Sequence, residues 1–327
     1  MPAPAIEARG LVKRYGETVA VGGVSFEVPS GTVTAVLGPN GAGKTTTVRM
    51  LTTLTVPDEG SATVAGYDVA KSPTEVRRRI GLAAQDATVD PLLTGRENLV
   101  MLGELHQISR KAAGGRAVEL LAEFDLTDAG DRPVSTYSGG MRRRLDLAAT
   151  LVALPTVLFL DEPTTGLDPR ARNELWAVLD TLVHRGTTVL LTTQYLEEAE
   201  RLAADIVVVD HGRIIAHGDS AKLKRDVGGD HLHVAIREEA ELARGIAIVE
   251  SITKTSAHVE HADRLVSAPT TAGVSAVAAA ASAFQAAGIE LDDLSLRQPT
   301  LDEVFLTLTG SPPDDSDPSQ LTEEGVA

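Results

Sequence analysis

The stretch that decides the fold is Gly38-Pro39-Asn40-Gly41-Ala42-Gly43-Lys44-Thr45, which matches the pattern G-x-x-x-x-G-K-[ST]. In this pattern the glycines let backbone N–H groups turn inward around a phosphate, and the helix that follows adds its dipole. Lys44 is expected to reach the terminal phosphates, and Thr45 to place its hydroxyl on Mg²⁺. An apolar strand pattern, 32–37, precedes the stretch and a helical pattern, 45–54, follows it. This context favours a phosphate-binding loop, here called the phosphate loop, over an ordinary glycine-rich turn.

A second candidate segment is the apolar run Val157-Leu158-Phe159-Leu160, which ends in Asp161-Glu162. Asp161, at the end of a strand, is expected to hold Mg²⁺, and Glu162 to polarise the water that attacks a phosphate. Taken alone, most such pairs are surface carboxylates. The prediction of a catalytic pair therefore depends on the phosphate loop in the same chain.

A third candidate is Tyr137-Ser138-Gly139-Gly140-Met141, here called the signature segment, which stands just before a helical pattern. Ser and two Gly at a helix start form another anion-binding end. One triphosphate does not need two such ends, whereas a head-to-tail dimer would use both. The alternative is a simple helix cap with a tight turn, and it would be preferred if the segment stood alone.

Apolar runs and helical patterns alternate along the first two thirds of the chain, which predicts a parallel α/β core. The runs 157–160, 188–193 and 206–209 are continuously apolar, as in strands covered on both faces. Between the phosphate loop and the signature segment, a capping box at Thr94 and Glu97 opens a helical stretch to about Glu123, expected to break at Gly114-Gly115.

The pattern of apolar residues changes near Asp219, which predicts a separate small α+β domain over 219–310. The runs 231–236, 246–252 and 265–268 alternate like strands, around one Ala-rich helix, 274–287. The remainder, 311–327, is Pro-rich and acidic and is expected to be disordered.

Composition excludes several classes of protein. The 327 residues carry a net charge of −16, which argues against binding of duplex nucleic acid. Cysteine is absent, so the chain has no disulfide and no thiolate site. No apolar run approaches the ~18 residues of a membrane span, and the first residues do not read as a signal peptide. The protein is expected in the cytosol, with any membrane role supplied by a partner.

Together the three segments resemble those of the ATP-binding-cassette (ABC) ATPases, in the family's order, over residues 5 to about 218. The resemblance implies an α/β P-loop NTPase core with an antiparallel β subdomain and a helical subdomain at about 86–150, all within a nucleotide-binding domain at 1–218. It implies ATP and Mg²⁺ as ligands. The phosphates would be bound by Gly38, Pro39, Asn40, Gly41, Ala42, Gly43, Lys44, Thr45 and Thr46, and from a second copy of the chain by Ser138, Gly139 and Gly140.

The resemblance also implies roles for three single residues. Tyr15 would stack on adenine, although a half-buried strand tyrosine is as good a reading. Gln85 would contact Mg²⁺ and the attacking water, against the alternative of a surface loop glutamine. Asp168 would lie at the dimer interface, and it also suits the cap of the helix that begins at Pro169.

One position departs from the family pattern. Where the family usually has histidine after the strand at 188–193, this chain has Gln194. Glutamine donates to a phosphate oxygen but carries no proton at neutral pH. We therefore expect Gln194 to position and sense phosphate, with Glu162 as the catalytic carboxylate, and slower turnover is a hypothesis.

The C-terminal domain resembles the extra domain of drug-exporter ATPase subunits of the daunorubicin-resistance type, through Leu296-Arg297-Gln298-Pro299-Thr300-Leu301-Asp302-Glu303-Val304-Phe305-Leu306. Thr300 suits a helix cap, and Leu301, Val304, Phe305 and Leu308 form one apolar face. That face either packs on its own domain or, as the resemblance implies, serves dimer assembly or docking to a membrane subunit.

The resulting prediction is an ATP-hydrolysing subunit of an ABC exporter that powers efflux of a drug- or antibiotic-like compound. It would act as a dimer at the cytoplasmic face of the cell membrane, on a separate permease subunit, with no nucleic acid as partner. The alternatives are an ABC-type ATPase that moves no solute, a weakly hydrolysing nucleotide-gated module, and a small-molecule kinase.

Overall fold

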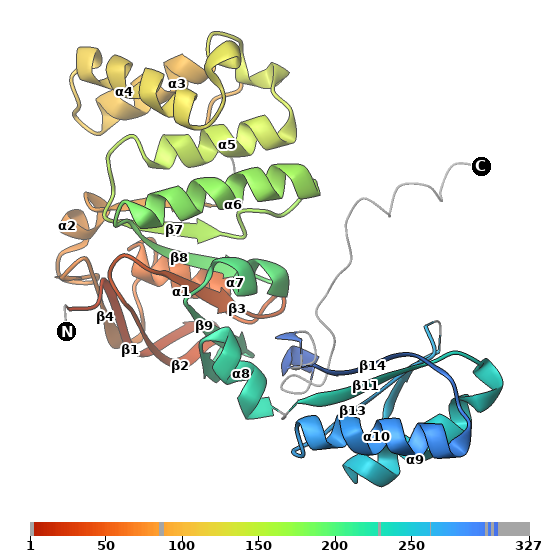
Figure 1. The fold of residues 1–327 in the computed structure, drawn as a ribbon. Helices are drawn as coiled ribbons and strands as arrows, with labels where there is room; N and C mark the ends of the chain where they lie inside the picture. The colour runs from red at the N-terminus through yellow and green to blue at the C-terminus, as the bar shows by residue number, and fades with distance from the viewer. Residues whose placement is uncertain are drawn as a thin grey trace, which may run out of the picture. The chain divides into compact units, whose positions relative to one another are not determined.

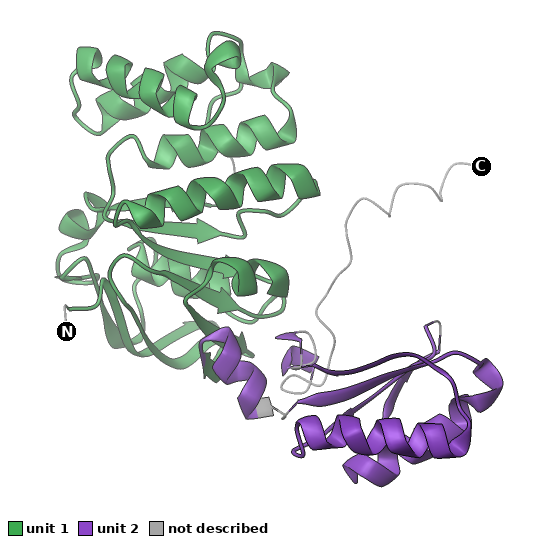
Figure 2. Cartoon of the chain, in the orientation of Figure 1, with its two compact units in different colours: residues 1–217, 313–327 green, residues 218–312 purple. Residues whose placement is uncertain are grey.

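The computed structural model describes residues 3–84, 88–227, 230–261, 263–297, 300–301 and 304–306. These residues divide into two compact units, one up to His217 and one from Gly218 onward (Figure 2). Each unit has its own apolar core. Gln85 and the acidic stretch 311–327 lie outside the described residues.

The centre of the first unit is a six-stranded sheet in the order β10-β9-β3-β8-β7-β6. Its strands are β3 (Val33–Leu37), β6 (Ile80–Ala83), β7 (Val157–Asp161), β8 (Thr188–Thr193), β9 (Asp205–Asp210) and β10 (Arg213–Gly218). The strands β6, β7, β8, β3 and β9 pair in parallel, as the alternating pattern predicts. Leu37 lies opposite Thr193, and Asp161 opposite Thr192. The phosphate loop, Glu162 and Gln194 therefore all leave the sheet at one edge.

A second, antiparallel sheet packs against this core. Its strands, in the order β2-β1-β4-β5, are β1 (Ile6–Tyr15), β2 (Thr18–Val28), β4 (Glu59–Val64) and β5 (Tyr67–Asp68). Phe26 of β2 and Phe159 of β7 belong to one buried cluster, together with Met50 of α1 (Lys44–Leu51). The short helix α2 (Pro73–Arg77) follows β5. Burial of this cluster fixes α1, and with it the phosphate loop, against the end of β3.

Helices α3 (Gly95–Leu105), α4 (Arg110–Glu123) and α5 (Gly139–Thr150) contact one another and lie at the end of the unit opposite to β1 and β2 (Figure 1). The predicted capping box of α3 is confirmed: the Glu97 amide donates to Thr94 Oγ1 at 3.1 Å, and the Thr94 amide to Glu97 Oε2 at 2.8 Å. The predicted break at Gly114-Gly115 is wrong, because both lie inside α4. The break is at residues 106–109, where Ser109 caps α4. Helices α6 (Pro169–His184) and α7 (Leu196–Leu202) complete the unit.

The second unit is an α+β sandwich. Helix α8 (Ser220–Val227) precedes an antiparallel sheet in the order β12-β13-β11-β14, formed by β11 (His231–Ile236), β12 (His258–Glu260), β13 (Leu265–Pro269) and β14 (Leu291–Arg297). Helix α10 (Val274–Ala287) lies where the Ala-rich pattern predicts it. The prediction of a strand at 246–252 is wrong: that run is part of α9 (Leu242–Thr253). Leu242, Gly245 and Val249, three or four residues apart, form the buried side of that helix, and this spacing overrides the apparent alternation.

No helix in the described part of the chain combines the length and the apolar character that a membrane span requires.

Candidate active site

The phosphate loop is held in a shape that only glycine permits at two positions. Gly41 and Gly43 have φ of 79° and 98°, in the left-handed region. A Cβ on Gly43 would lie 2.4 Å from the Ala20 carbonyl oxygen, and one on Gly38 would lie 2.2 Å from the Val209 oxygen. Strands β2 and β9 therefore pack closely against the loop. The loop borders a cavity of about 290 Å³. Amide groups of such a loop and the start of α1 suit a phosphate.

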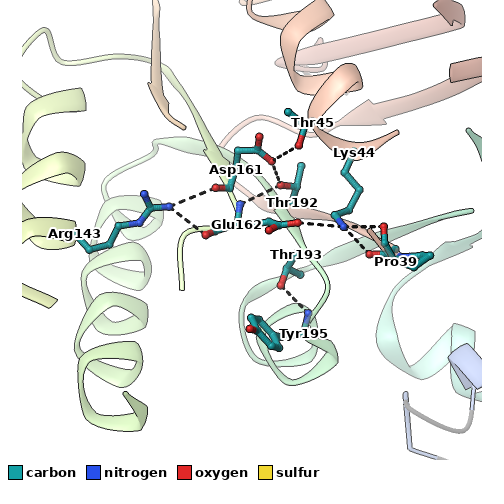
Figure 3. Close-up of polar contacts among 10 residues, drawn as sticks. Pro39, Lys44, Thr45, Arg143, Asp161, Glu162, Thr192, Thr193 and Tyr195 are labelled. Carbon is teal, nitrogen blue, oxygen red and sulfur yellow. Dashed lines mark hydrogen bonds and ion pairs between the residues drawn. The ribbon is translucent and has the colours of Figure 1, made fainter. Parts of the chain in front are cut away.

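Lys44 lies folded back within this loop. Its Nζ donates to the carbonyl oxygens of Gly38 at 2.7 Å and Pro39 at 3.0 Å, and lies 3.3 Å from Glu162 Oε1 (Figure 3). Only 4% of its side chain is exposed. Burial lowers the pKa of Lys44, and the nearby carboxylates of Glu162 and Asp161 oppose that shift. The buried ammonium group of Lys44 therefore contacts two neutral carbonyl groups and one carboxylate. A phosphate group, which carries more negative charge, would replace them as its partner.

Asp161, at the end of β7, is buried and receives two hydroxyl groups. Thr192 Oγ1 donates to Asp161 Oδ1 at 2.5 Å, and Thr45 Oγ1 donates to the same oxygen at 3.3 Å (Figure 3). Carboxylate and hydroxyl oxygens are the ligands that Mg²⁺ prefers. Thr45 and Asp161 therefore fit a magnesium ion at the edge of the phosphate loop.

Glu162 has a strained backbone. Its φ is 49°, in the left-handed region that side chains other than Gly and Asn rarely adopt. Its amide donates to the Thr192 carbonyl at 3.1 Å and to Thr192 Oγ1 at 3.2 Å. Such strain costs on the order of 1–3 kcal/mol and persists where the surroundings enforce it. The conformation places the carboxylate beside Lys44, at the border of the phosphate-loop cavity.

The signature segment begins α5. Ser138 is the N-cap, and its Oγ accepts from the Met141 amide at 3.2 Å, so the predicted cap is present. Tyr137 has a structural role: its hydroxyl donates to the Ala129 carbonyl at 2.7 Å, and burial raises its pKa. Ser138, Gly139 and Gly140 border a cavity of about 390 Å³ together with Asp168. No residue of the phosphate loop borders that cavity, so one chain presents the two predicted phosphate-binding ends in different cavities.

The other predicted site residues lie as follows. Thr46 borders the phosphate-loop cavity. Asp168 caps α6, with Oδ1 accepting from the Ala171 amide at 2.7 Å. Tyr15 does not border the cavity described for the phosphate loop; it is 50% exposed at the end of β1, with Lys13 Nζ 5.7 Å from its ring centre. Gln194 follows β8, and its Oε1 is buried without a hydrogen-bond partner among the described residues. Gln85 lies outside the described residues.

Sequence reasoning missed three charged side chains that pack behind this site. Arg143, on α5, is partly buried, whereas Asp146, on the same helix, and Glu198, on α7, are buried. Arg143 belongs to the run Arg142-Arg143-Arg144, which the sequence predicts as a solvated face or, in part, as a source of positive potential beside the signature segment, with no catalytic role. In the structure Arg143 donates to the Asp161 carbonyl at the end of β7, whereas its neighbour Arg144 donates to the Phe124 carbonyl.

Comparison with known proteins agrees with this geometry. The family model described as "ABC transporter" matches residues 21–165. The chain is 54% identical over 306 residues to daunorubicin resistance ATP-binding protein DrrA2 of Streptomyces coeruleorubidus, covering 94% of this chain and 95% of that protein. It is 49% identical over 323 residues to daunorubicin/doxorubicin resistance ATP-binding protein DrrA of Streptomyces peucetius, covering 99% and 98%. A solved structure of an ATP-binding subunit of an ABC transporter superposes with a TM-score of 0.62 at 28% identity, over 68% of this chain and 92% of that one.

Proposed function

This chain belongs to the ABC transporter family of ATPases, and from that premise we propose that it drives the export of a drug-like compound through a separate membrane protein. The observation that supports ATP hydrolysis is the cluster of Lys44, Thr45, Asp161 and Glu162 at one edge of the sheet. The support for export is that identity of 49–54% to resistance proteins extends over nearly the whole chain, second unit included. The site of action would be the cytoplasmic face of the membrane.

Each residue of the cluster has a role in hydrolysis that follows from its chemistry. The amides of the phosphate loop and Lys44 would bind the β- and γ-phosphates of ATP. Thr45 and Asp161 would hold Mg²⁺, which neutralises charge on the phosphates when it is bound. Glu162 would accept a proton from the attacking water, and Gln194 would donate to a γ-phosphate oxygen.

The contact between Lys44 and Glu162 gives the order of events. A γ-phosphate carries more charge than the carboxylate and offers three acceptor oxygens, so Lys44 would leave Glu162 for it. The Glu162 carboxylate, no longer paired with Lys44, would then bind water. Nucleotide binding would thereby prepare the general base for its reaction.

The two cavities support a dimer in which each ATP is bound by the phosphate loop of one copy and by Ser138, Gly139 and Gly140 of the other. Such a contact is isologous, as a two-fold dimer requires. ATP would favour the closed dimer, and loss of the γ-phosphate would open it. The resulting motion would be passed to the membrane subunit.

The experiment is sedimentation of Glu162→Gln with and without Mg·ATP. We expect ATP to convert this variant from monomer to dimer, because the γ-phosphate is retained. The added change Gly139→Glu is the control: a Cβ there meets no atom within 4 Å, so the helix tolerates it, but its charge would face the γ-phosphate. It should keep ATP binding and lose the dimer. A Glu162→Gln protein that binds ATP and stays monomeric contradicts the proposal and favours a kinase-like enzyme.

A second candidate, a weakly hydrolysing nucleotide-gated module, is favoured by Gln194 alone, since this residue cannot shuttle a proton. The test is Gln194→His, with kcat for ATP hydrolysis and ATP affinity as readouts. Under the exporter proposal Gln194 positions the γ-phosphate, so the variant changes at least one of these values. A kcat that rises by orders of magnitude supports the weakly hydrolysing module.

A further inference from the structure

Arg143 binds the backbone at the end of the catalytic strand. Its Nε donates to the Pro163 carbonyl at 2.7 Å. Its Nη2 donates to the carbonyls of Glu162 at 3.2 Å and Asp161 at 3.4 Å (Figure 3). Its Nη1 donates to the Ala84 carbonyl, at the end of β6, at 2.9 Å. One guanidinium on α5 thus connects the helix of the signature segment to four carbonyl groups of the strand ends.

A second contact from the same helix supports this connection. Asp146, one turn after Arg143, is 5% exposed, and its Oδ1 accepts from the Thr88 amide at 2.9 Å. Burial raises the pKa of Asp146, while Arg143 opposes the rise. Two charged side chains on one side of α5 therefore bind the described backbone on both sides of the segment 85–87.

We infer that Arg143 is a positioning residue for hydrolysis: it holds the Glu162 peptide in its strained conformation and ties it to the helix that begins with the signature segment. The inference rests on the catalytic role proposed for Glu162. It adds a direct mechanical route, within one chain, from the helix that would contact the partner's ATP to the carboxylate that would act on this chain's own ATP.

The strain explains why such a residue is needed. Without external contacts the peptide at Glu162 would relax from its φ of 49° to an ordinary region, and the carboxylate would move. The Glu162 amide donates to the carbonyl and hydroxyl oxygens of Thr192, and Arg143 donates to the Glu162 carbonyl on the other side of the same residue. Removal of one side leaves the peptide able to rotate, and a shift of about 1 Å in a catalytic group costs up to ~100-fold in rate.

The charge of the Arg143 guanidinium also favours a role in positioning Glu162 over a role in packing alone. A guanidinium remains charged in proteins, and its fixed fork matches several carbonyls at once. Burial lowers the pKa of Arg143, and the carboxylates of Asp146, Glu198 and Asp161 compensate. An apolar side chain of similar size would fill the space at lower desolvation cost, but it would leave four carbonyl groups without these donors.

The test is a double-mutant cycle on the full-length chain, with Arg143→Gln and Glu162→Gln singly and together. Steady-state hydrolysis and equilibrium ATP binding are measured for each protein. We expect Arg143→Gln to lower kcat by about 10- to 100-fold while the ATP dissociation constant stays within about twofold, because the phosphate loop is untouched. In the Glu162→Gln background the same change should lower the residual rate by less than about twofold, since the carboxylate it positions is gone.

Two further variants make the result decisive. Arg143→Lys retains the charge and the length of the side chain but not the planar guanidinium, so its kcat should lie between those of wild type and Arg143→Gln. If Arg143→Gln does not yield folded protein, Arg143→Lys alone provides the test. Arg110→Gln, on the exposed start of α4, is the matched control for loss of one arginine and should leave kcat unchanged.

The inference is overturned if Arg143→Gln has a kcat within twofold of wild type or loses kcat and ATP affinity in parallel. It is also overturned if Arg143→Gln lowers the rate equally in the wild-type and the Glu162→Gln protein. Failure of the proposed function reads differently: Glu162→Gln would then hydrolyse ATP at the wild-type rate, whatever Arg143→Gln does.

Discussion

The carboxyl group of Glu198 is buried near the edge of the sheet from which Glu162 and Gln194 extend. It is fully buried on α7, Trp176 Nε1 donates to its Oε1 at 3.4 Å, and its Oε2 has no hydrogen-bond partner among the described residues. Burial raises its pKa to about 7. The side chain is therefore partly protonated at neutral pH.

We predict that this carboxyl makes stability fall as pH rises. Because its pKa is higher in the folded than in the unfolded chain, its contribution is full below the unfolded value and is lost as pH rises through about 7. Relative to Glu198→Gln, the wild type should lose up to about 3 kcal/mol of unfolding free energy between pH 5 and pH 8. Denaturant titrations at both pH values measure the difference. The exposed neighbour Glu197→Gln should show no such dependence, and a constant difference for Glu198→Gln would contradict the prediction.

Within the phosphate loop, two glycines with similar backbone angles predict different outcomes. A Cβ on Gly41 meets no atom within 4 Å, whereas one on Gly43 lies 2.4 Å from the Ala20 carbonyl oxygen. Gly41→Ala should cost only the left-handed strain, about 1–2 kcal/mol. Gly43→Ala must also displace β2 or α1, so it should lower Tm further and weaken ATP binding. Thermal unfolding of both variants checks this, and equal Tm values would show that the Ala20 contact is unimportant.

At the scale of elements, local patterns gave much of the fold. The continuous apolar runs at β7, β8 and β9 and the Ala-rich α10 lie where the sequence predicts them. The strand expected at 246–252 failed because the helical spacing of the buried residues begins before this run, at Leu242 and Gly245. The packing of Gly245 against Ile236 favours the helix. Gly114-Gly115 failed as a helix break because intrahelical bonds and contacts with α3 outweigh a cost of about 1 kcal/mol per glycine.

Some residues of the candidate site are likewise predictable from local sequence, and others are not. Lys44, Thr45, Asp161 and Glu162 belong to motifs whose spacing determines their position, so sequence places them together. Arg143, Asp146 and Glu198 are brought to the site only by the packing of α5 and α7, and no local pattern marks their burial.

At the scale of the whole molecule, the two units have separate cores, which include Phe159 in the first and Phe284 in the second. The phosphate loop and the signature segment both belong to the first unit. Nucleotide therefore stabilises the first core directly, and the second only to the extent that the units are coupled.

We predict two transitions in calorimetry of the full-length Glu162→Gln protein. Mg·ATP at 100 times its dissociation constant should stabilise the first unit by ~2.7 kcal/mol and leave the other transition in place. Lys44→Ala in the same background is the control and should lose the shift, because it lacks the ammonium group proposed to bind phosphate. One transition that moves as a whole would mean that the units unfold together.

The separation of the phosphate loop and the signature segment into different cavities has a consequence for gene dosage. In the proposed dimer each reaction chamber takes one half from each copy, so a defective polypeptide also disables a chamber that its healthy companion helps to form. When equal amounts of intact and defective polypeptide pair at random, only about a quarter of the assemblies contain two sound copies. Where transport requires both chambers, such alleles act dominantly, and output scales with the square of the sound fraction.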